Sequence, residues 1–318
     1  MAEIGIDIAK AKQLLESNEL VAIPTETVYG LAANALSEDA IVKVYTTKNR
    51  PKFDPLIAHV DSLEKVEALT KNVPEKAKVL ASQFWPGPLT ILLDKKPNVP
   101  DLLTSGLGRV AVRIPNHPLT LELLSQLDFP LAAPSANPFG YVSPTTAKHV
   151  DDQLGEKINY ILDGGKCNVG LESTIVGFEG EDAIVYRLGG TKVEAIEQAI
   201  GAVNVNVNMS SNPAAPGMLK SHYSPGRKMI IGDISANLSK LDKTTTGVIS
   251  FRDSFDVPKT NLSVLSESGD LEEAARNIFS SLRLMDQKHI EVVLAEYVPK
   301  EGLGRAINDR LRRAAAED

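Results

Sequence analysis

The chain has 318 residues, of which 43% are hydrophobic and 24% charged, with a formal net charge of −7. The length predicts two domains, and the composition is that of an ordinary globular protein. No apolar stretch approaches the roughly 20 residues that are needed to cross a bilayer. The acidic balance excludes a protein that coats nucleic acid through bulk charge, so any anion site must be local. A single cysteine, Cys167, excludes an internal disulfide framework. The N-terminal stretch is unlike a signal peptide. Together with the single cysteine, this predicts a cytoplasmic protein.

The first 200 residues alternate short apolar runs with amphipathic stretches. The runs are rich in Val and Ile, which predicts strands, and they cover residues 20–24, 55–60, 89–93, 110–115, 130–134, 159–163, 173–178 and 183–188. Helical spacing occurs over residues 38–48 and 120–127. We therefore predict an α/β domain over residues 1–205, with a twisted mixed sheet flanked by helices. The pattern leaves the order of the strands open.

The character of the sequence changes near residue 205. Residues 206–228 are polar, contain three prolines and have no helical period, which predicts an extended linker. Beyond it, apolar runs predict strands over residues 228–234, 245–251, 262–266 and 291–298. An amphipathic period predicts helices over residues 271–287 and 304–318. We therefore predict a small C-terminal α/β, Rossmann-like domain over residues 229–318.

Several common sites are absent from the sequence. It contains no GxxxxGK[ST], GxGxxG, CxxC, HExxH or GxSxG motif, and five scattered histidines with one cysteine predict no structural zinc site. We assign no metal ligands. Polar residues instead follow the ends of six apolar runs, and ligands of α/β sheets bind outside strand ends. Turn and cap residues would produce the same pattern one by one, but six such ends favour a shared site.

A cluster of cations precedes the run at residues 55–60. Lys48, Arg50 and Lys52 lie within five consecutive positions of a chain that is acidic overall. A solvated basic loop would explain them, and so would a local site for an anion.

Seven stretches, taken in order, identify a family. They are PTETVYGLAANA, KNRPKFDPLIAHV, WPGPLTILL, VAVRIPNHP, APSANPFGYVSPTTAKHV, ILDGGKCNVGLESTIV and RLGG. They closely resemble the YrdC-like family of threonylcarbamoyl-AMP synthases. The segments APGMLKSHYSP and GLGRAINDRLRRAAAED resemble the long, two-domain form of that family. The resemblance therefore covers nearly the whole chain.

The resemblance implies synthesis of L-threonylcarbamoyl-AMP from L-threonine, bicarbonate (or CO2) and ATP, with release of pyrophosphate. In the family, this product supplies the threonylcarbamoyl group of a modified adenosine beside the anticodon, in tRNAs that read ANN codons. We expect Mg²⁺ to accompany ATP and a tRNA threonylcarbamoyl transferase complex to receive the product. We expect no membrane partner, and weak contact with RNA is left open.

The same resemblance implies the residues that bind ATP. Lys48 and Arg50 match the family's phosphate-binding positions and are the expected catalytic residues, since Arg offers a planar fork and Lys a point charge. Asp54, where many relatives carry Asn, adds a negative charge near the phosphates unless it helps to hold magnesium. The other expected ATP contacts are Ser135, Asn137, Ser143, Arg187, His222 and Tyr223. Lys52 receives no role.

Threonine requires a cation for its carboxylate and a small pocket for its side chain. Arg113 matches the family's carboxylate-binding arginine, and the other matched positions are Thr25, Thr27, His59 and Ser173. Without the motif, His59 would be interpreted as a packed strand histidine. Excluding serine depends on one methyl group, which is worth about 1–3 kcal/mol. The preference for threonine over serine should therefore be finite.

The scheme requires no nucleophilic side chain. The amine of threonine captures carbon dioxide or bicarbonate, and the resulting carbamate attacks the α-phosphate, so catalysis consists of positioning and electrostatics. The segment around His222 and Tyr223 resembles one that folds over the cleft in the family. Such a cover would protect the readily hydrolysed product from water.

Two rival functions are considered. A nucleic-acid-binding module without catalysis disagrees with the acidic composition and with an aromatic content of 5%. Carbamoyl transfer, as in hydrogenase-maturation proteins with a related domain, would require zinc-finger cysteines that this chain lacks.

Overall fold

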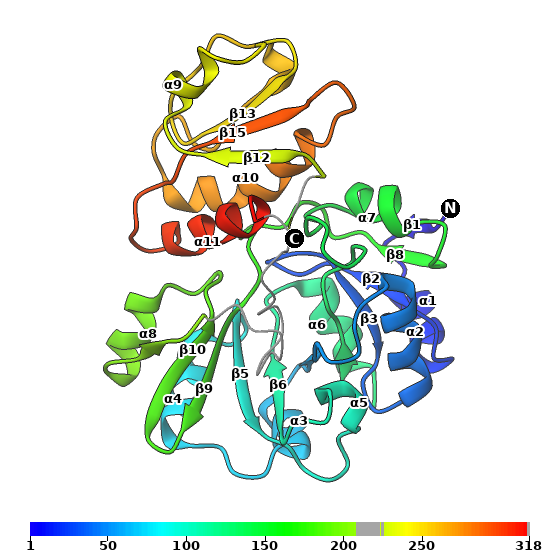
Figure 1. Cartoon of the computed structure of the whole chain (residues 1–318). Helices are drawn as coiled ribbons and strands as arrows, with labels where there is room; N and C mark the ends of the chain where they lie inside the picture. Colours follow the sequence, from blue (N-terminus) through cyan, green and yellow to red (C-terminus); the bar gives the residue numbers. More distant parts are fainter. Residues whose placement is uncertain (208–222, 224–225, 317–318) are drawn as a thin grey trace.

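The computed structural model describes residues 1–207, 223 and 226–316. Strands of the first 205 residues form an eleven-stranded sheet in the order β1-β8-β2-β3-β7-β4-β6-β5-β9-β10-β11, and later strands form a four-stranded sheet in the order β12-β15-β13-β14. Figure 1 shows the two sheets as separate bodies, with α10 and α11 on the side of the smaller one that faces the larger. The predicted α/β fold with a mixed sheet is confirmed.

Each of the eight predicted runs overlaps a strand of the larger sheet. Its strands are β1 Glu3–Gly5, β2 Val21–Ile23, β3 Gly30–Asn34, β4 Ile57–His59, β5 Leu89–Asp94, β6 Arg109–Arg113, β7 Leu131–Ala132, β8 Tyr160–Leu162, β9 Thr174–Glu179, β10 Asp182–Arg187 and β11 Asn204–Val205. The accompanying helices are α1 Ile8–Glu16, α2 Glu38–Lys48, α3 Leu63–Leu69, α4 Glu75–Phe84, α5 Asp101–Thr104, α6 Pro118–Ser125, α7 Ala147–Leu154 and α8 Val193–Ile200.

The smaller sheet is parallel throughout, as expected for a Rossmann-like unit. Its elements are β12 Lys228–Ile231, α9 Ile234–Leu238, β13 Thr246–Ser250, the 3-10 helix η1 Lys259–Asn261, β14 Leu262–Val264, α10 Leu271–Leu284, β15 Val292–Ala295 and α11 Gly304–Ala314. Most of the predicted linker, residues 208–222 and 224–225, lies outside the described residues.

Helix α2 shows how the sequence sets the loop that follows it. Ser37 caps its first turn by accepting a hydrogen bond from the Ala40 amide, and acidic residues follow at positions favoured by the helix dipole. Asn49 adopts a left-handed conformation, with φ 52°, and ends the helix. Lys48 is therefore the last helical residue, and Arg50 lies in the loop that leads to β4.

One edge of the larger sheet collects the polar ends of several strands. Strands β4 and β6 are parallel, and their last residues, His59 and Arg113, are register partners. Strand β5 runs antiparallel to β6 and parallel to β9, so the segment before Thr174 reaches the same edge. Strand β10 is antiparallel to β9 and ends there at Arg187. The topology thus places residues from distant parts of the sequence together.

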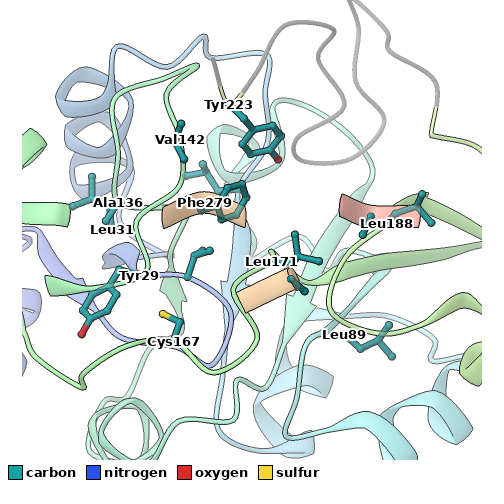
Figure 2. Packing of buried hydrophobic residues seen from close by; sticks show 14 of the residues in the cluster. Tyr29, Leu31, Leu89, Ala136, Val142, Cys167, Leu171, Leu188, Tyr223 and Phe279 are labelled. Carbon is teal, nitrogen blue, oxygen red and sulfur yellow. The ribbon is translucent and has the colours of Figure 1, made fainter. Parts of the chain in front are cut away.

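The two sheets are joined through helix α10 and a shared apolar core. Phe279 of α10 is fully buried, and its ring stacks on Tyr223 with 5.4 Å between the ring centroids. Figure 2 shows both rings beside Val142. Gly170 lies directly against the backbone of α10, where an added Cβ would stand 2.5 Å from Cα of Arg276. The close contact requires a residue without a side chain.

We expect Gly170→Ala to lower the free energy of unfolding by about 3 kcal/mol, through backbone strain and the clash with α10. Gly170 has a φ of +76°, and Gly106 has a φ of +78° with no atom within 4 Å of an added Cβ. Gly106→Ala is therefore a control with the strain but not the clash, and should cost about 1 kcal/mol. Urea denaturation measures both. Equal losses would contradict tight packing of α10 on Gly170.

Candidate active site

A cavity opens at the polar edge of the larger sheet. Of the predicted site residues, those that line it are Thr27, Arg50, His59, Arg113, Ser135, Ser173, Arg187 and Tyr223. Apolar residues complete the wall, among them Val28, Leu56, Ile57 and Ala133. Three arginines in so small a space indicate a site for anionic ligands.

Arg113 is held at the cavity wall by three groups. Its Nε donates to the carbonyl oxygen of Gly87 (3.1 Å), its Nη1 to the hydroxyl of Thr27 (3.0 Å), and its Nη2 pairs with Glu26 Oε1 at 2.7 Å. Thr25 does not line the cavity, but its hydroxyl lies 2.7 Å from that of Thr27. The guanidinium is thus fixed in orientation before any ligand binds.

His59 is a neutral imidazole in this environment. Burial, and then the neighbouring Arg113 cation, lower its pKa from 6.5 to about 3. Its Nδ1 lies 3.1 Å from the carbonyl oxygen of Ile57, which fits an Nδ1–H donor. At neutral pH its Nε2 can accept a hydrogen bond from a ligand, and the side chain adds no charge.

The pKa of His59 predicts a specific loss of stability in acid. Because its folded-state pKa of about 3 lies below the ordinary 6.5, the unfolded chain takes up the proton first. The contribution of neutral His59 to the free energy of unfolding is complete above pH 6.5 and is lost as the pH falls toward 3. Between pH 7 and pH 5 this amounts to about 2 kcal/mol. We expect His59→Gln to remove that part of the pH dependence, measured by urea denaturation at both pH values. The same pH dependence in variant and wild type would contradict it.

Ser173 and Arg187 form a second fixed group on the wall. Arg187 donates through Nε to the carbonyl oxygen of Ser173 and through Nη2 to its hydroxyl, both at 2.9 Å. The Ser173 hydroxyl also lies 2.7 Å from that of Thr90. Burial lowers the pKa of Arg187 to about 10, which still leaves it a cation at neutral pH.

Arg50 is folded back onto its own loop. Its Nε donates to the carbonyl oxygen of Asp54 (3.0 Å) and its Nη2 to that of Pro55 (2.9 Å), and Nη2 also pairs with Asp54 Oδ2 at 2.9 Å. Asp54 is fully buried behind Arg50 and does not line the cavity. The loop therefore presents one arginine and hides its carboxylate.

Lys48 is buried beside the cavity rather than on its wall. Its ammonium donates to the carbonyl oxygens of Ser135 and Asn137, and the side chain is nearly inaccessible. Burial, together with the nearby Arg50, lowers the pKa of Lys48 well below its ordinary value. In this structure Lys48 ties the end of α2 to the segment that carries Ser135. Contact between Lys48 and a ligand would require its ammonium to change partners.

Two further predicted residues are buried behind the wall. The side chain of Asn137 donates to the carbonyl oxygens of Pro138 (2.8 Å) and Tyr141 (2.9 Å) and so shapes a turn. The hydroxyl of Ser143 donates to Glu172 Oε1 at 2.7 Å. Ser143 therefore supports a group that lines the cavity, Glu172.

Glu172 is a cavity residue that we did not predict from the sequence. Its Oε2 pairs at 3.0 Å with Nε of Arg310, which lies in α11 of the C-terminal unit. Burial alone would raise the pKa of Glu172, but Arg310 and Arg187 together lower it to about 2. The sequence feature that could have indicated it is its position in the GLES stretch. Its partner, Arg310, lies 138 residues away in the chain, so the local sequence does not indicate the pair.

Tyr223 reaches the cavity from the predicted linker. Its amide donates to the carbonyl oxygen of Gly140 at 2.8 Å, and the guanidinium of Arg310 lies over its ring at 5.2 Å. Burial raises the pKa of Tyr223 to about 12, so the phenol stays protonated. His222, the other linker residue predicted to reach the nucleotide, lies outside the described residues.

The described residues contain no group of three or more His, Cys, Asp or Glu side chains placed to hold a metal ion. The carboxylates at or directly behind the cavity wall, Glu172, Asp54 and Glu26, are each paired with an arginine. None of the helices in the described part of the chain combines the length and apolar character of a membrane span.

Two family models match consecutive parts of the chain. The Sua5/YciO/YrdC model, described as "Telomere recombination", matches residues 13–189, and the model "Threonylcarbamoyl-AMP synthase, C-terminal domain" matches residues 191–316. The chain therefore belongs to the Sua5/YciO/YrdC family, in the two-domain form typical of its long threonylcarbamoyl-AMP synthases. The resemblance inferred from the motifs is confirmed.

Full-length relatives support the same assignment. A threonylcarbamoyl-AMP synthase of Pyrococcus abyssi is 40% identical, with 96% of this chain and 93% of the relative covered. The synthase of Bacillus subtilis strain 168 is 39% identical, with 97% and 92% covered. Among solved structures, P. abyssi Sua5 complexed with L-threonine matches with a TM-score of 0.92 and 38% identity, over 99% of this chain and 98% of that one.

Proposed function

We propose that this chain is a threonylcarbamoyl-AMP synthase, which converts L-threonine, bicarbonate (or CO2) and ATP into L-threonylcarbamoyl-AMP and pyrophosphate. The observation that carries the proposal is the cavity itself, in which Arg50, Arg113 and Arg187 converge around a neutral histidine. The phosphates of ATP and the carboxylate of threonine, brought together for reaction, need such a site. The full-length synthase relatives and the threonine-bound structure of one of them support the proposal.

Threonine is proposed to bind at the end of β6. Arg113 would hold its carboxylate, because the guanidinium is fixed and buried at the wall. Thr27, His59 and Ser173 line the same cavity and would form the pocket around the amino group and side chain. Thr25 would act one step behind, through its hydroxyl contact with Thr27.

ATP is proposed to enter as its magnesium complex, which lowers the charge on its phosphates. Arg50 would bind the phosphates from the loop, and Arg187, Ser135 and Tyr223 would contact the nucleotide from the opposite wall. Lys48, Asn137 and Ser143 are placed to support this surface from behind; a direct phosphate contact of Lys48 would need the rearrangement described above. His222 is proposed to join Tyr223 over the nucleotide.

The reaction needs no covalent intermediate with the protein. The neutral amine of threonine adds to carbon dioxide and releases a proton, or condenses with bicarbonate and releases water; either route gives a carbamate. A carbamate oxygen then bonds to the α-phosphorus as the bond to pyrophosphate breaks. The arginines stabilise the charge that moves onto the leaving group, which is how phosphoryl-type transfer is usually catalysed.

The product is a mixed anhydride, so a second enzyme must use it before water does. We propose that a tRNA threonylcarbamoyl transferase complex in the cytoplasm accepts it for tRNAs that read ANN codons. A single buried cysteine, Cys167, agrees with a reducing compartment.

The decisive experiment measures pyrophosphate release with one substrate omitted at a time. We expect release only when ATP, threonine and bicarbonate are all present, together with the adenylate seen by mass spectrometry. Serine in place of threonine should support release with kcat/KM lower by about 10- to 200-fold, because one methyl group separates them. Pyrophosphate release without threonine or without bicarbonate would overturn the proposed reaction.

A further inference from the structure

Two of the three cavity arginines have a buried carboxylate directly behind them. Arg50 pairs with Asp54 at 2.9 Å and Arg113 pairs with Glu26 at 2.7 Å, each through Nη2. All four side chains are at most 7% exposed. The arginines line the cavity, whereas the carboxylates stand behind its wall.

The two pairs share one geometry. In each, the guanidinium also donates to backbone: Arg50 to the carbonyl oxygens of Asp54 and Pro55, and Arg113 to that of Gly87. A guanidinium has five N–H groups in one plane, so fixing one side of that plane fixes the direction of the others. The carboxylate and the carbonyls hold the rear of the fork. The rest of each guanidinium belongs to the cavity wall.

Arg187 is held mainly by uncharged groups, and the nearby Glu172 carboxylate forms its ion pair with Arg310 instead. The Nε and Nη2 of Arg187 are held by the carbonyl and hydroxyl of Ser173. The carboxylates at the other two arginines therefore call for an explanation beyond general packing. A buried cation without a partner is costly, and a carboxylate removes that cost while the cavity holds no anion.

We propose that Asp54 and Glu26 are positioning residues, each of which serves one arginine and thereby one substrate: Asp54 acts on ATP through Arg50, and Glu26 acts on threonine through Arg113. The proposal deepens the function proposed above and rests on it. For Asp54 it replaces a direct contact with ATP or magnesium by an indirect role. Glu26 received no role from the sequence.

Single substitutions separate the two substrates. Asp54→Ala should raise KM for ATP about tenfold and leave KM for threonine within about twofold, because Arg50 loses the ion pair that helps to fix its guanidinium. Glu26→Ala should do the reverse. Asp54→Asn and Glu26→Gln keep a polar oxygen beside the guanidinium, so each should restore its KM to within about threefold of wild type. Lys52→Ala, in the same loop as Asp54, is the control that should change neither value.

A double-mutant cycle then tests whether each carboxylate acts through its arginine. Calorimetry measures binding of MgATP alone and of threonine alone, so no turnover is needed. In an Arg50→Ala background, adding Asp54→Ala should change ATP affinity by less than about twofold, and the same should hold for Glu26→Ala and threonine in Arg113→Ala.

Several results would overturn the proposal. They are full additivity in either cycle, an amide variant as impaired as its alanine variant, a raised magnesium requirement in Asp54→Asn, and loss of affinity for both substrates in one alanine variant. Normal affinity for the other substrate shows that a variant is folded. If wild type bound both ligands but released no pyrophosphate, the proposed function would fail while the cycles still decided the roles of the carboxylates.

Discussion

Arg310→Ala is expected to lower the free energy of unfolding by about 3–5 kcal/mol, because it leaves the buried carboxylate of Glu172 without its ion-pair partner. Arg310 is fully buried in α11, where it pairs with Glu172 at 3.0 Å and with Asp309 at 2.8 Å. It also donates to the carbonyl oxygen of Leu188 at 2.8 Å and lies over the ring of Tyr223. One side chain of the C-terminal unit thus holds a cavity carboxylate and a cavity aromatic ring.

The same substitution should reduce pyrophosphate release at least tenfold under conditions where the variant is still folded, because Glu172 and Tyr223 both line the cavity. Arg312→Ala is the matched control: it lies in the same helix, is about half exposed and pairs with Asp309 from the solvent side. Exposed pairs contribute at most about 1 kcal/mol, so this control should stay near wild type. Urea denaturation and the pyrophosphate assay measure both variants. Wild-type stability in Arg310→Ala would show that α11 is not fixed by this network.

Local signals in the sequence were sufficient for the parts of the site that depend on strand ends. The predicted helix over residues 38–48 has the bounds of α2, because a serine cap and a left-handed asparagine define its ends. His59 and Arg113 end adjacent parallel strands, as their positions after apolar runs indicated. The strand pattern and the family motifs therefore predicted most of the residues that line the cavity.

Strand β3 shows where local signals were too weak. Its sequence, GLAAN, has small residues with low strand propensity, and we did not predict it. It becomes a strand because β2 and β7 pair with it on both sides. Tertiary pairing decides its conformation, and a window of single-sequence propensity contains no information about those partners.

The orientation of buried charges was likewise beyond the sequence. Lys48 was predicted to face phosphates, yet its ammonium lies against two carbonyl oxygens that are 87 and 89 residues away in the chain. The pairing of Glu172 with Arg310 spans 138 residues. Motifs identify which residue types occur at a site, whereas the direction of each side chain depends on contacts that only the fold creates.

Arg113→Ala is expected to lower kcat/KM for threonine by about 10²–10³-fold, because it removes a buried, charge-assisted partner of a carboxylate. Its guanidinium is 4% exposed and held by Gly87, Thr27 and Glu26, so no water or mobile cation could replace it at small cost. Binding of MgATP, measured without threonine, should stay within about threefold of wild type, because Arg50 and Arg187 remain. Steady-state pyrophosphate release and calorimetry provide the two readings.

Arg109→Ala is the control for this substitution, since Arg109 begins the same strand whose last residue is Arg113. Arg109 contacts the Tyr186 ring and hydroxyl and is not among the residues that line the cavity. Arg109→Ala should therefore leave kcat/KM for threonine and the binding of MgATP unchanged. Because Arg113→Ala also leaves Glu26 as a buried, unpaired acid, the pair Arg113→Ala with Glu26→Gln should recover stability but not threonine use. Recovery of threonine use in that pair would mean that Arg113 serves the fold, and that another cation binds the carboxylate.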